Sequence, residues 1–177
     1  MEETFEGVFG FENHEELINE MMSEYGQDIL RLVYSYVNNK EVAEDLTQDI
    51  FVKFYKSLHT FKGKSKLKTW LWRIAINHCK DFLKSWYTKH VSIAEDTTYI
   101  KTKKEMVEEV IIQKEAEDQL ISAIMSLPIK YREVIYLYYY EELLIKEIAV
   151  LTEVSVNTVK TRIRRAKELL EERLEER

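Results

Sequence analysis

Lysine and arginine side chains gather in two segments of this 177-residue sequence. Residues 51–90 carry 10 basic residues and one acidic residue, Asp81, whereas residues 156–167 carry 5 basic residues and none that is acidic. Spaced cations on a helical scaffold bind polyanions, because neutralising phosphates releases the counterions condensed on a nucleic acid. Either segment alone could equally be a solvated helix face, so the motifs within the two segments decide between these interpretations.

The second basic segment belongs to a helix-turn-helix pattern. A short helix from Lys146 to Thr152, a tight connection over residues 153–155 and a long helix from Val156 have the spacing of that motif. Val159 and Ile163 are expected to face inward, which leaves the basic side chains outside, where a major groove could receive them. An ordinary helical corner is the alternative. We predict phosphate contacts near the helix start and groove contacts beyond it, from Asn157, Thr158, Lys160, Thr161, Arg164 and Arg165.

The tight connection departs from the usual motif at Glu153. Such motifs commonly have glycine there, because glycine reaches a left-handed backbone conformation without strain. A residue with a side chain at that position costs about 1–2 kcal/mol. Ser155 is placed to cap the second helix.

The first basic segment combines a loop with a helix. Residues 61–66 interrupt the helical period with a glycine and alternating lysines, which indicates a basic loop. A helix from about residue 67 to residue 86 follows, on which Trp72, Asn77 and Lys80 are expected to project away from the core. The positions that suit a core are Trp70, Leu71, Ile74, Phe82 and Leu83.

Amphipathic helices are expected on both sides of this segment. Upstream, residues 28–39 and 41–59 have helical apolar spacing, and the second helix leaves a polar face with Glu44, Asp45, Gln48 and Asp49, which is either a contact surface or simply solvated. Downstream, residues 88–104 form a polar linker, followed by helices over residues 105–127 and 129–142. With 4 glycines and 1 proline, the composition favours helices over β-sandwiches or barrels.

Other function classes have little support in the sequence. One cysteine, Cys79, excludes an internal disulfide framework, and no run approaches the roughly 18 apolar residues of a membrane span. The acidic N-terminus is unlike a signal peptide, so the cytoplasm is the expected compartment. The four histidines are scattered, and the adjacent His78 and Cys79 point about 100° apart on a helix. We therefore expect no metal site, no catalytic residues, no cofactor and no enzymatic activity.

Together these pieces resemble the bacterial sigma-70 family, specifically its extracytoplasmic-function (ECF) group, over about residues 20–175. Residues 44–51 look like the segment that docks on the β′ clamp of RNA polymerase. The loop at residues 61–65 with residues 69–77 looks like the promoter-melting and minus-ten segment, and is the most specific of the three matches. Residues 127–134, 146–149 and 158–162 look like the minus-thirty-five reader.

The resemblance implies roles for particular residues. The polymerase clamp would be contacted by Asp45, Gln48 and Asp49. The loop would form a pocket for a flipped non-template base, with Phe61 and Asn77 closest to it, which agrees with the aromatic, amide and cationic groups present. Trp70 would be either a buried anchor or a strand-separating wedge. The implied minus-ten contacts are Phe61, Lys62, Lys64, Ser65, Lys66, Lys68, Trp70, Arg73, Asn77 and Lys80.

The resemblance also implies an all-α fold with two small helical domains joined by a linker. Residues 1–19 would be an acidic N-terminal extension, residues 20–88 sigma domain 2, residues 89–110 the linker and residues 111–177 sigma domain 4 with the helix-turn-helix. Expected partners are bacterial core RNA polymerase, through its β′ clamp and β subunits, promoter DNA and an anti-sigma factor, which in this family is frequently membrane-bound.

The function implied is that of an alternative sigma factor, which directs core polymerase to promoters and melts them. The alternative is a stand-alone helix-turn-helix regulator that binds duplex DNA as a dimer, and a two-fold symmetric operator would identify it. The net charge of −6 fits the first function, because a free sigma factor binds DNA weakly until polymerase supplies further contacts.

Overall fold

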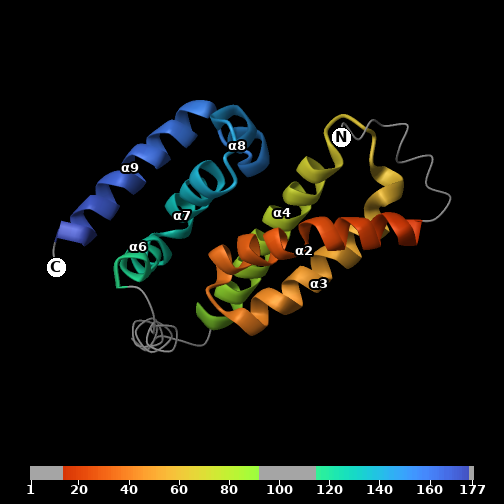
Figure 1. Cartoon of the computed structure of the whole chain (residues 1–177), viewed down its shortest axis with the longest axis horizontal. Helices are drawn as coiled ribbons and strands as arrows, with labels where there is room; N and C mark the ends of the chain where they lie inside the picture. Colours follow the sequence, from red (N-terminus) through yellow and green to blue (C-terminus); the bar gives the residue numbers. More distant parts are fainter. Residues whose placement is uncertain (1–13, 92–114, 176–177) are drawn as a thin grey trace. The chain divides into compact units, whose positions relative to one another are not determined.

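The computed structural model describes residues 14–91 and 115–175, and every regular element within them is helical (Figure 1). The first helices are α2 (His14–Val37), α3 (Lys40–Ser57), the short 3₁₀ helix η1 (Leu58–Thr60) and α4 (Leu67–Val91). The others are α6 (Glu115–Met125), α7 (Ile129–Ile135), the π-helical turn η2 (Tyr136–Tyr140), α8 (Ile145–Thr152) and α9 (Val156–Glu175). The chain divides into two compact units: one holds the residues up to Asp81 together with Val150–Glu153, and the other holds Phe82–Ala149 and the residues from Val154 onward. The all-α fold predicted from the sequence is confirmed.

The first unit is built on the long helices α2, α3 and α4. Helix α2 begins at His14, inside the segment predicted as an acidic extension, and Glu15 and Glu16 in its first turn complement the helix dipole. Asn38, with a φ of 51°, ends α2. Asn39 starts α3, because its side-chain oxygen accepts a 2.9 Å hydrogen bond from the Val42 N–H.

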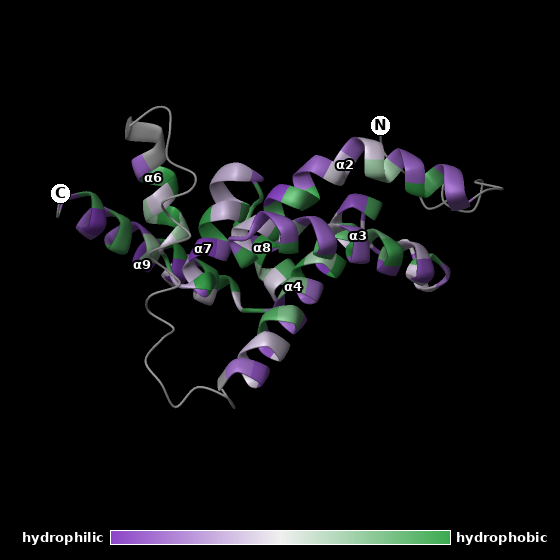
Figure 2. Cartoon of the chain, turned by 90° about the horizontal axis from the view of Figure 1, so that it is seen from below, coloured by the Kyte–Doolittle hydropathy of each residue, from purple (hydrophilic) through white to green (hydrophobic). Residues whose placement is uncertain are grey.

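The core of the first unit takes one stripe from each of these helices. Helix α2 contributes Ile29, Leu32 and Val33, which are all completely buried. Figure 2 shows α2 and α3 alternating between hydrophobic and hydrophilic residues, as expected for helices with one buried face. The buried residues of α3 are Ala43, Leu46, Ile50, Phe51 and Phe54, and those of α4 are Leu67, Leu71, Trp72, Ala75, Ile76 and Cys79.

The buried stripe of α4 differs from the sequence prediction. Trp72, predicted to project outward, is only 1% exposed, and its ring lies edge-on to the Tyr25 ring of α2 at 5.5 Å between centroids. Trp70, predicted as a core residue, is only partly buried, and so are Ile74, Phe82 and Leu83. Helix α4 has apolar residues on two neighbouring stripes, and helical spacing alone does not decide which of them its neighbours cover.

The second unit packs the long helix α9 against α7 and α6, which lie alongside it in Figure 1. Leu127, Ile135 and Ala166 form a buried cluster at its centre. The predicted helix over residues 129–142 is divided into α7 and the turn η2, and the part of the predicted helix over residues 105–114 lies outside the described residues. Further buried residues of this unit are Val134, Leu137, Ile148, Val159 and Ile163.

Two polar contacts fix α7 within this unit. The Arg132 guanidinium, 7% exposed, donates a 2.9 Å hydrogen bond from Nη2 to the Leu127 carbonyl, and burial lowers the pKa of Arg132 below its ordinary value. Glu133 of α7 is 4% exposed and lies 3.8 Å from Nη1 of Arg162 on α9. Because Glu133 is buried, its pairing with Arg162 helps to set how α9 lies on α7.

The connection between α8 and α9 has the geometry that the sequence predicted. Glu153 has a φ of 59°, and the Val154 N–H donates a 3.2 Å hydrogen bond to the Ala149 carbonyl. This hydrogen bond spans six residues and encloses the left-handed Glu153, which is a common way for a helix to end. It ends α8 and turns the chain toward α9. Ser155 then caps α9, because its Oγ accepts a 3.1 Å hydrogen bond from the Thr158 N–H.

Replacing Glu153 with glycine should therefore stabilise the protein. Glycine adopts this left-handed conformation without the clash of a Cβ atom, so we expect Glu153→Gly to raise the free energy of unfolding by about 1 kcal/mol. Urea denaturation of the full chain, followed by circular dichroism, measures the change. Glu171→Gly, the same substitution in the ordinary helical backbone of α9, should lower stability by about 1 kcal/mol. A loss of stability in both variants would contradict the assigned strain at Glu153.

Candidate polymerase and nucleic-acid interfaces

The polar face of α3 is exposed as a continuous surface. Asp45, Gln48 and Asp49 all lie in solvent, while Leu46 and Ile50, which alternate with them at helical spacing, are buried against the rest of the unit. The three polar side chains predicted to contact polymerase therefore share one face. Val52, three residues after Asp49 and 51% exposed, extends this face with an apolar residue. Sequence reasoning missed Val52, although its i+3 spacing from Asp49 was available.

His78 connects this face to α4. Its Nε2 lies 3.9 Å from Oδ2 of Asp49, too far for a hydrogen bond, and it has no hydrogen-bond partner in the part of the chain that the structure describes. Burial lowers the pKa of His78 below its ordinary value of 6.5, and the positive charge of Lys53 lowers it further. The carboxylates of Asp49 and Asp81 act in the opposite direction without cancelling the effect.

The basic loop after η1 is anchored by three aromatic rings. The Phe61 ring lies 5.0 Å from the Trp70 ring, which lies 5.2 Å from the Phe54 ring of the core. Gly63, with a φ of 65°, supplies the left-handed turn in the loop between Phe61 and Trp70. Lys62, Lys64 and Lys66 are exposed, and Ser65 is partly buried. Trp70 thus acts as an anchor for Phe61, which keeps a partly exposed aromatic face beside a group of lysines.

A stripe of α4 continues from this loop. Trp70, Arg73, Asn77 and Lys80 follow one another at intervals of three and four residues, and all four are partly buried. The structure therefore brings together the aromatic, amide and cationic groups predicted for minus-ten recognition.

The Lys80 Nζ donates a 3.3 Å hydrogen bond to the Thr152 carbonyl, and Lys68 is a further exception among the predicted minus-ten residues. Two residues from Trp70, it lies on a different side of α4, and its Nζ sits 4.8 Å from the Trp72 ring centroid and 5.4 Å from that of Tyr25. This cation–π geometry directs the ammonium group toward α2 instead of toward the loop.

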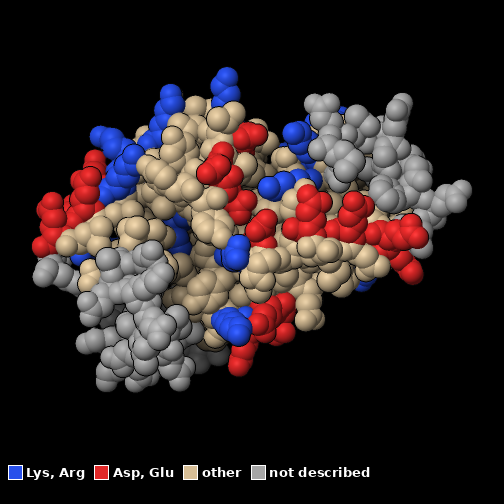
Figure 3. Space-filling view, viewed as in Figure 1, with Lys and Arg blue, Asp and Glu red and all other residues tan. Residues whose placement is uncertain are grey.

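Helix α9 presents the predicted reading surface. Val159, Ile163 and Ala166 are buried, and the exposed residues are Asn157, Lys160, Thr161, Arg164 and Arg165. Thr158 is partly buried, and its hydroxyl oxygen lies 2.8 Å from Ser155 Oγ within the cap. In Figure 3, lysine and arginine side chains gather over the first half of α9, its C-terminal end is acidic, and a row of acidic side chains follows α2.

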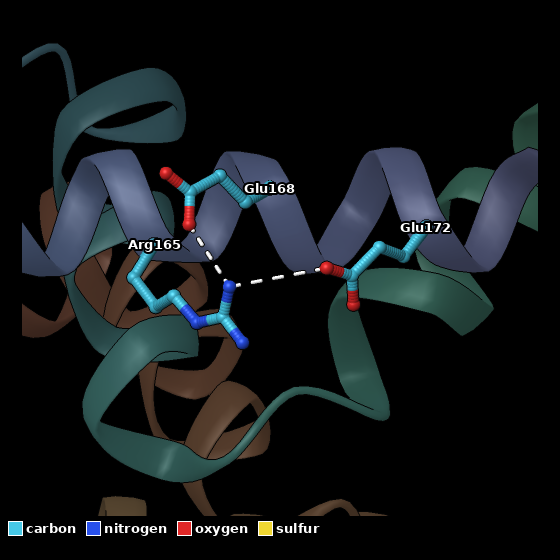
Figure 4. Close-up of polar contacts among 3 residues, drawn as sticks. All are labelled: Arg165, Glu168 and Glu172. Carbon is cyan, nitrogen blue, oxygen red and sulfur yellow. Dashed lines mark hydrogen bonds and ion pairs between the residues drawn. The ribbon is translucent and has the colours of Figure 1, made fainter.

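Arg165 already has carboxylate partners on α9. Its Nη1 lies 2.9 Å from Oε2 of Glu168 and 3.9 Å from Oε1 of Glu172, as Figure 4 shows. The hydrogen bond to Glu168 raises the pKa of Arg165 above its ordinary value. Lys167 has its Nζ 5.5 Å from the Tyr139 ring centroid. Sequence reasoning missed these partners, although the i+3 and i+7 spacing of the glutamates was a signal for them.

Two further observations concern metals and membranes. Within the two described segments, no three histidine, cysteine or acidic side chains come together as a metal site would require, and Cys79 is a buried free thiol. None of the helices that the structure describes combines the length and apolar composition needed to cross a membrane.

Comparison with protein families matches both parts of the chain. Residues 21–87 match the family model described as sigma-70 region 2, and residues 117–170 match sigma-70 region 4. RNA polymerase sigma factor SigV of Bacillus subtilis is 31% identical over 154 residues, which cover 84% of this chain and 86% of SigV. ECF RNA polymerase sigma factor SigW, also of Bacillus subtilis, is 34% identical over 158 residues, which cover 85% and 84%.

This chain belongs to the ECF group of sigma-70 factors. An ECF sigma factor is a non-catalytic subunit that directs RNA polymerase in transcription initiation. The alternative of a stand-alone regulator is excluded, because the chain matches sigma-70 region 2 in addition to region 4, which contains the helix-turn-helix.

Solved structures agree with the fold of this ECF sigma factor. The sigma factor RpoE of Bartonella quintana, in complex with the anti-sigma factor NepR, has a TM-score of 0.71 at 21% identity, covering 89% of this chain and 96% of that one. CnrH, in complex with the cytosolic domain of CnrY, has a TM-score of 0.66 at 22% identity, covering 95% and 92%.

The lowered pKa of His78 gives this sigma factor a defined pH dependence. Unfolded, His78 titrates near 6.5, whereas in the folded protein it takes up its proton only at lower pH. Between these two pKa values the unfolded chain binds more protons, so the free energy of unfolding falls as the pH falls. His78→Gln should therefore lose less stability than the wild type between about pH 7.5 and about pH 5.5.

Urea midpoints measured across that pH range test the prediction. His59→Gln is the matched control, because His59 is exposed on η1 and its replacement should leave the wild-type pH dependence unchanged. Parallel curves for wild type and His78→Gln would show that the environment of His78 does not disfavour its charged form.

Proposed function

We propose that each of the three surfaces of this sigma factor makes a different contact during initiation. The polar face of α3 binds the β′ clamp of core polymerase, the loop and stripe of α4 hold the melted minus-ten strand, and α9 reads the minus-thirty-five element. The observation that carries this proposal is the exposure of Asp45, Gln48 and Asp49 beside the buried Leu46 and Ile50. Asp49 approaches His78 of α4 at 3.9 Å, and the exposed acidic and amide side chains of this face remain accessible to a polar partner surface.

The minus-ten role rests on the three aromatic rings in contact at the loop. Phe61 is held by Trp70, which is held by Phe54, so a base stacked on Phe61 would meet a surface already fixed in place. Asn77 supplies amide hydrogen bonds on the same side of α4, and the exposed lysines neutralise the phosphates of the strand. Trp70 supports the loop in this proposal, and Lys68 contributes charge from another side of the helix.

The domain limits proposed for this arrangement are those of the sequence analysis. Residues 20–88 form domain 2, residues 89–110 the linker and residues 111–177 domain 4, and the linker spans the distance between the two promoter elements. The cytoplasm, where polymerase and promoter DNA are found, is the proposed site of action.

An anti-sigma factor is a further proposed partner. RpoE and CnrH, which have similar folds, were both solved in complexes, one of them with a named anti-sigma factor and the other with the cytosolic domain of CnrY. We propose that an anti-sigma factor, soluble or membrane-bound, restrains this chain as well.

Single-round transcription tests the function directly. Purified bacterial core polymerase is supplied with a pool of genomic fragments from the source of the sequence, with and without this protein. We expect defined start sites that appear only when the protein is present, and their shared upstream sequences would give the two promoter elements. An absence of new start sites, together with a failure to bind core polymerase, would overturn the proposal.

Reversing the charge of Asp49 tests the clamp contact. Asp49 is exposed on the face proposed to meet polymerase, so Asp49→Arg should weaken core binding at least tenfold, since like charges juxtaposed across an interface are strongly unfavourable. Fluorescence anisotropy of the labelled full chain titrated with core polymerase measures the affinity. Glu20→Arg, an identical charge reversal at an exposed position of α2, is the control and should bind like the wild type. Equal affinities for Asp49→Arg and the control would exclude this face.

A further inference from the structure

The basic residues on the outer face of α9 are not equally available. Arg165 is bound by Glu168 and Glu172, whereas Lys160 and Arg164 have no ion pair with any carboxylate in the described part of the chain. The three side chains of the ion-pair network remain exposed to solvent, at 46% for Arg165, 42% for Glu168 and 59% for Glu172. The network is thus a surface feature that can open and close.

The two carboxylates also fix the direction of the guanidinium. Glu168 and Glu172 lie one and two turns after Arg165, and Figure 4 shows the guanidinium between them, turned toward the C-terminal half of α9. Recognition helices contact base edges mainly through their N-terminal residues. In the paired conformation Arg165 therefore points away from the part of α9 that enters the groove.

This pairing changes what Arg165 gains from a phosphate. An unpaired arginine gains a new charge partner when it meets DNA, but a paired one exchanges carboxylates for a phosphate and exposes those carboxylates to the DNA charge. A free sigma factor makes few phosphate contacts, so one withheld arginine is a large part of its affinity. In the polymerase complex DNA is held at high local concentration, and opening exposed ion pairs is then a small cost.

We propose that Glu168 and Glu172 form a carboxylate clamp on Arg165 that suppresses DNA binding by the sigma factor when it is not attached to polymerase. This proposal rests on the proposed role of α9 in reading the minus-thirty-five element. The clamp makes Glu168 and Glu172 positioning residues, which act on DNA through Arg165 and not by touching it.

The test is binding of the full-length protein to a duplex that lacks promoter elements. The double variant Glu168→Gln with Glu172→Gln should bind about threefold to tenfold more tightly than the wild type at low salt. Its slope of log affinity against log salt should steepen by about one unit, since one more cation contacts phosphate. Fluorescence anisotropy over a salt series measures both quantities.

Glu171→Gln is the matched control. Glu171 is exposed on α9 between the two clamp residues, and its replacement removes one negative charge without removing a partner of Arg165. It should therefore produce a much smaller gain and no change in the salt slope. A gain per removed charge equal to that of the double variant would show that general repulsion, and not the clamp, weakens DNA binding.

Arg165→Ala separates the clamp from the proposed function. If the clamp acts through Arg165, the two glutamine substitutions in a background that carries Arg165→Ala should give only the small gain expected from removing two negative charges. An equal gain in both backgrounds would overturn the clamp. The minus-thirty-five role is tested separately, by transcription from a promoter identified with the wild-type holoenzyme. Unchanged transcription with Arg165→Ala would overturn that role for Arg165, while an Arg165-dependent gain in the free protein would still support the clamp.

Discussion

The burial of Trp72 is the constraint on which the proposed minus-ten surface depends. Its ring is enclosed in the core of the first unit and meets the Tyr25 ring of α2, so it fixes the rotation of α4 about its own axis. With Trp72 inside, Trp70, Arg73 and Asn77 turn toward the outer side, next to the basic loop. A rotation by one residue, about 100°, would bury Trp70 and remove the support of Phe61. The largest apolar side chain of the core thereby positions the face proposed to contact the minus-ten strand.

The same principle orients α9, although the deciding residues there include an ion pair. Val159, Ile163 and Ala166 are buried along one stripe, and Arg162 turns inward to meet the buried Glu133. One of the basic residues of this helix is therefore used to hold the fold and is not available to DNA. The number of basic residues in the sequence of α9 therefore overstates how many are available to DNA. Some hold the fold, as Arg162 does, and some pair with carboxylates of the same helix, as Arg165 does.

Local features could be predicted from the sequence. The buried face of a helix could not be predicted where two faces of that helix are about equally apolar. The inward face of α9 and the left-handed backbone at Glu153 follow from spacing and from the geometry of the turn, and both predictions are confirmed. The choice between Trp70 and Trp72 was predicted wrongly, since α4 is apolar on two adjoining stripes and only the positions of α2 and α3 select one. The approach of His78 to Asp49 joins two helices, so no local pattern contains it.

The arrangement of charge explains how a chain of net charge −6 serves as a DNA-binding subunit. The first 50 residues carry 13 acidic and 2 basic side chains, whereas basic side chains gather on the loop, on α4 and on the first half of α9. Each basic surface is small, and two arginines of α9, Arg162 and Arg165, already pair with carboxylates, so no surface alone gathers many phosphate contacts. Because affinity for DNA grows steeply with the number of phosphates neutralised, dividing the cations among separate surfaces makes each weak by itself. Strong binding then requires both surfaces at once, on DNA that polymerase has aligned and opened.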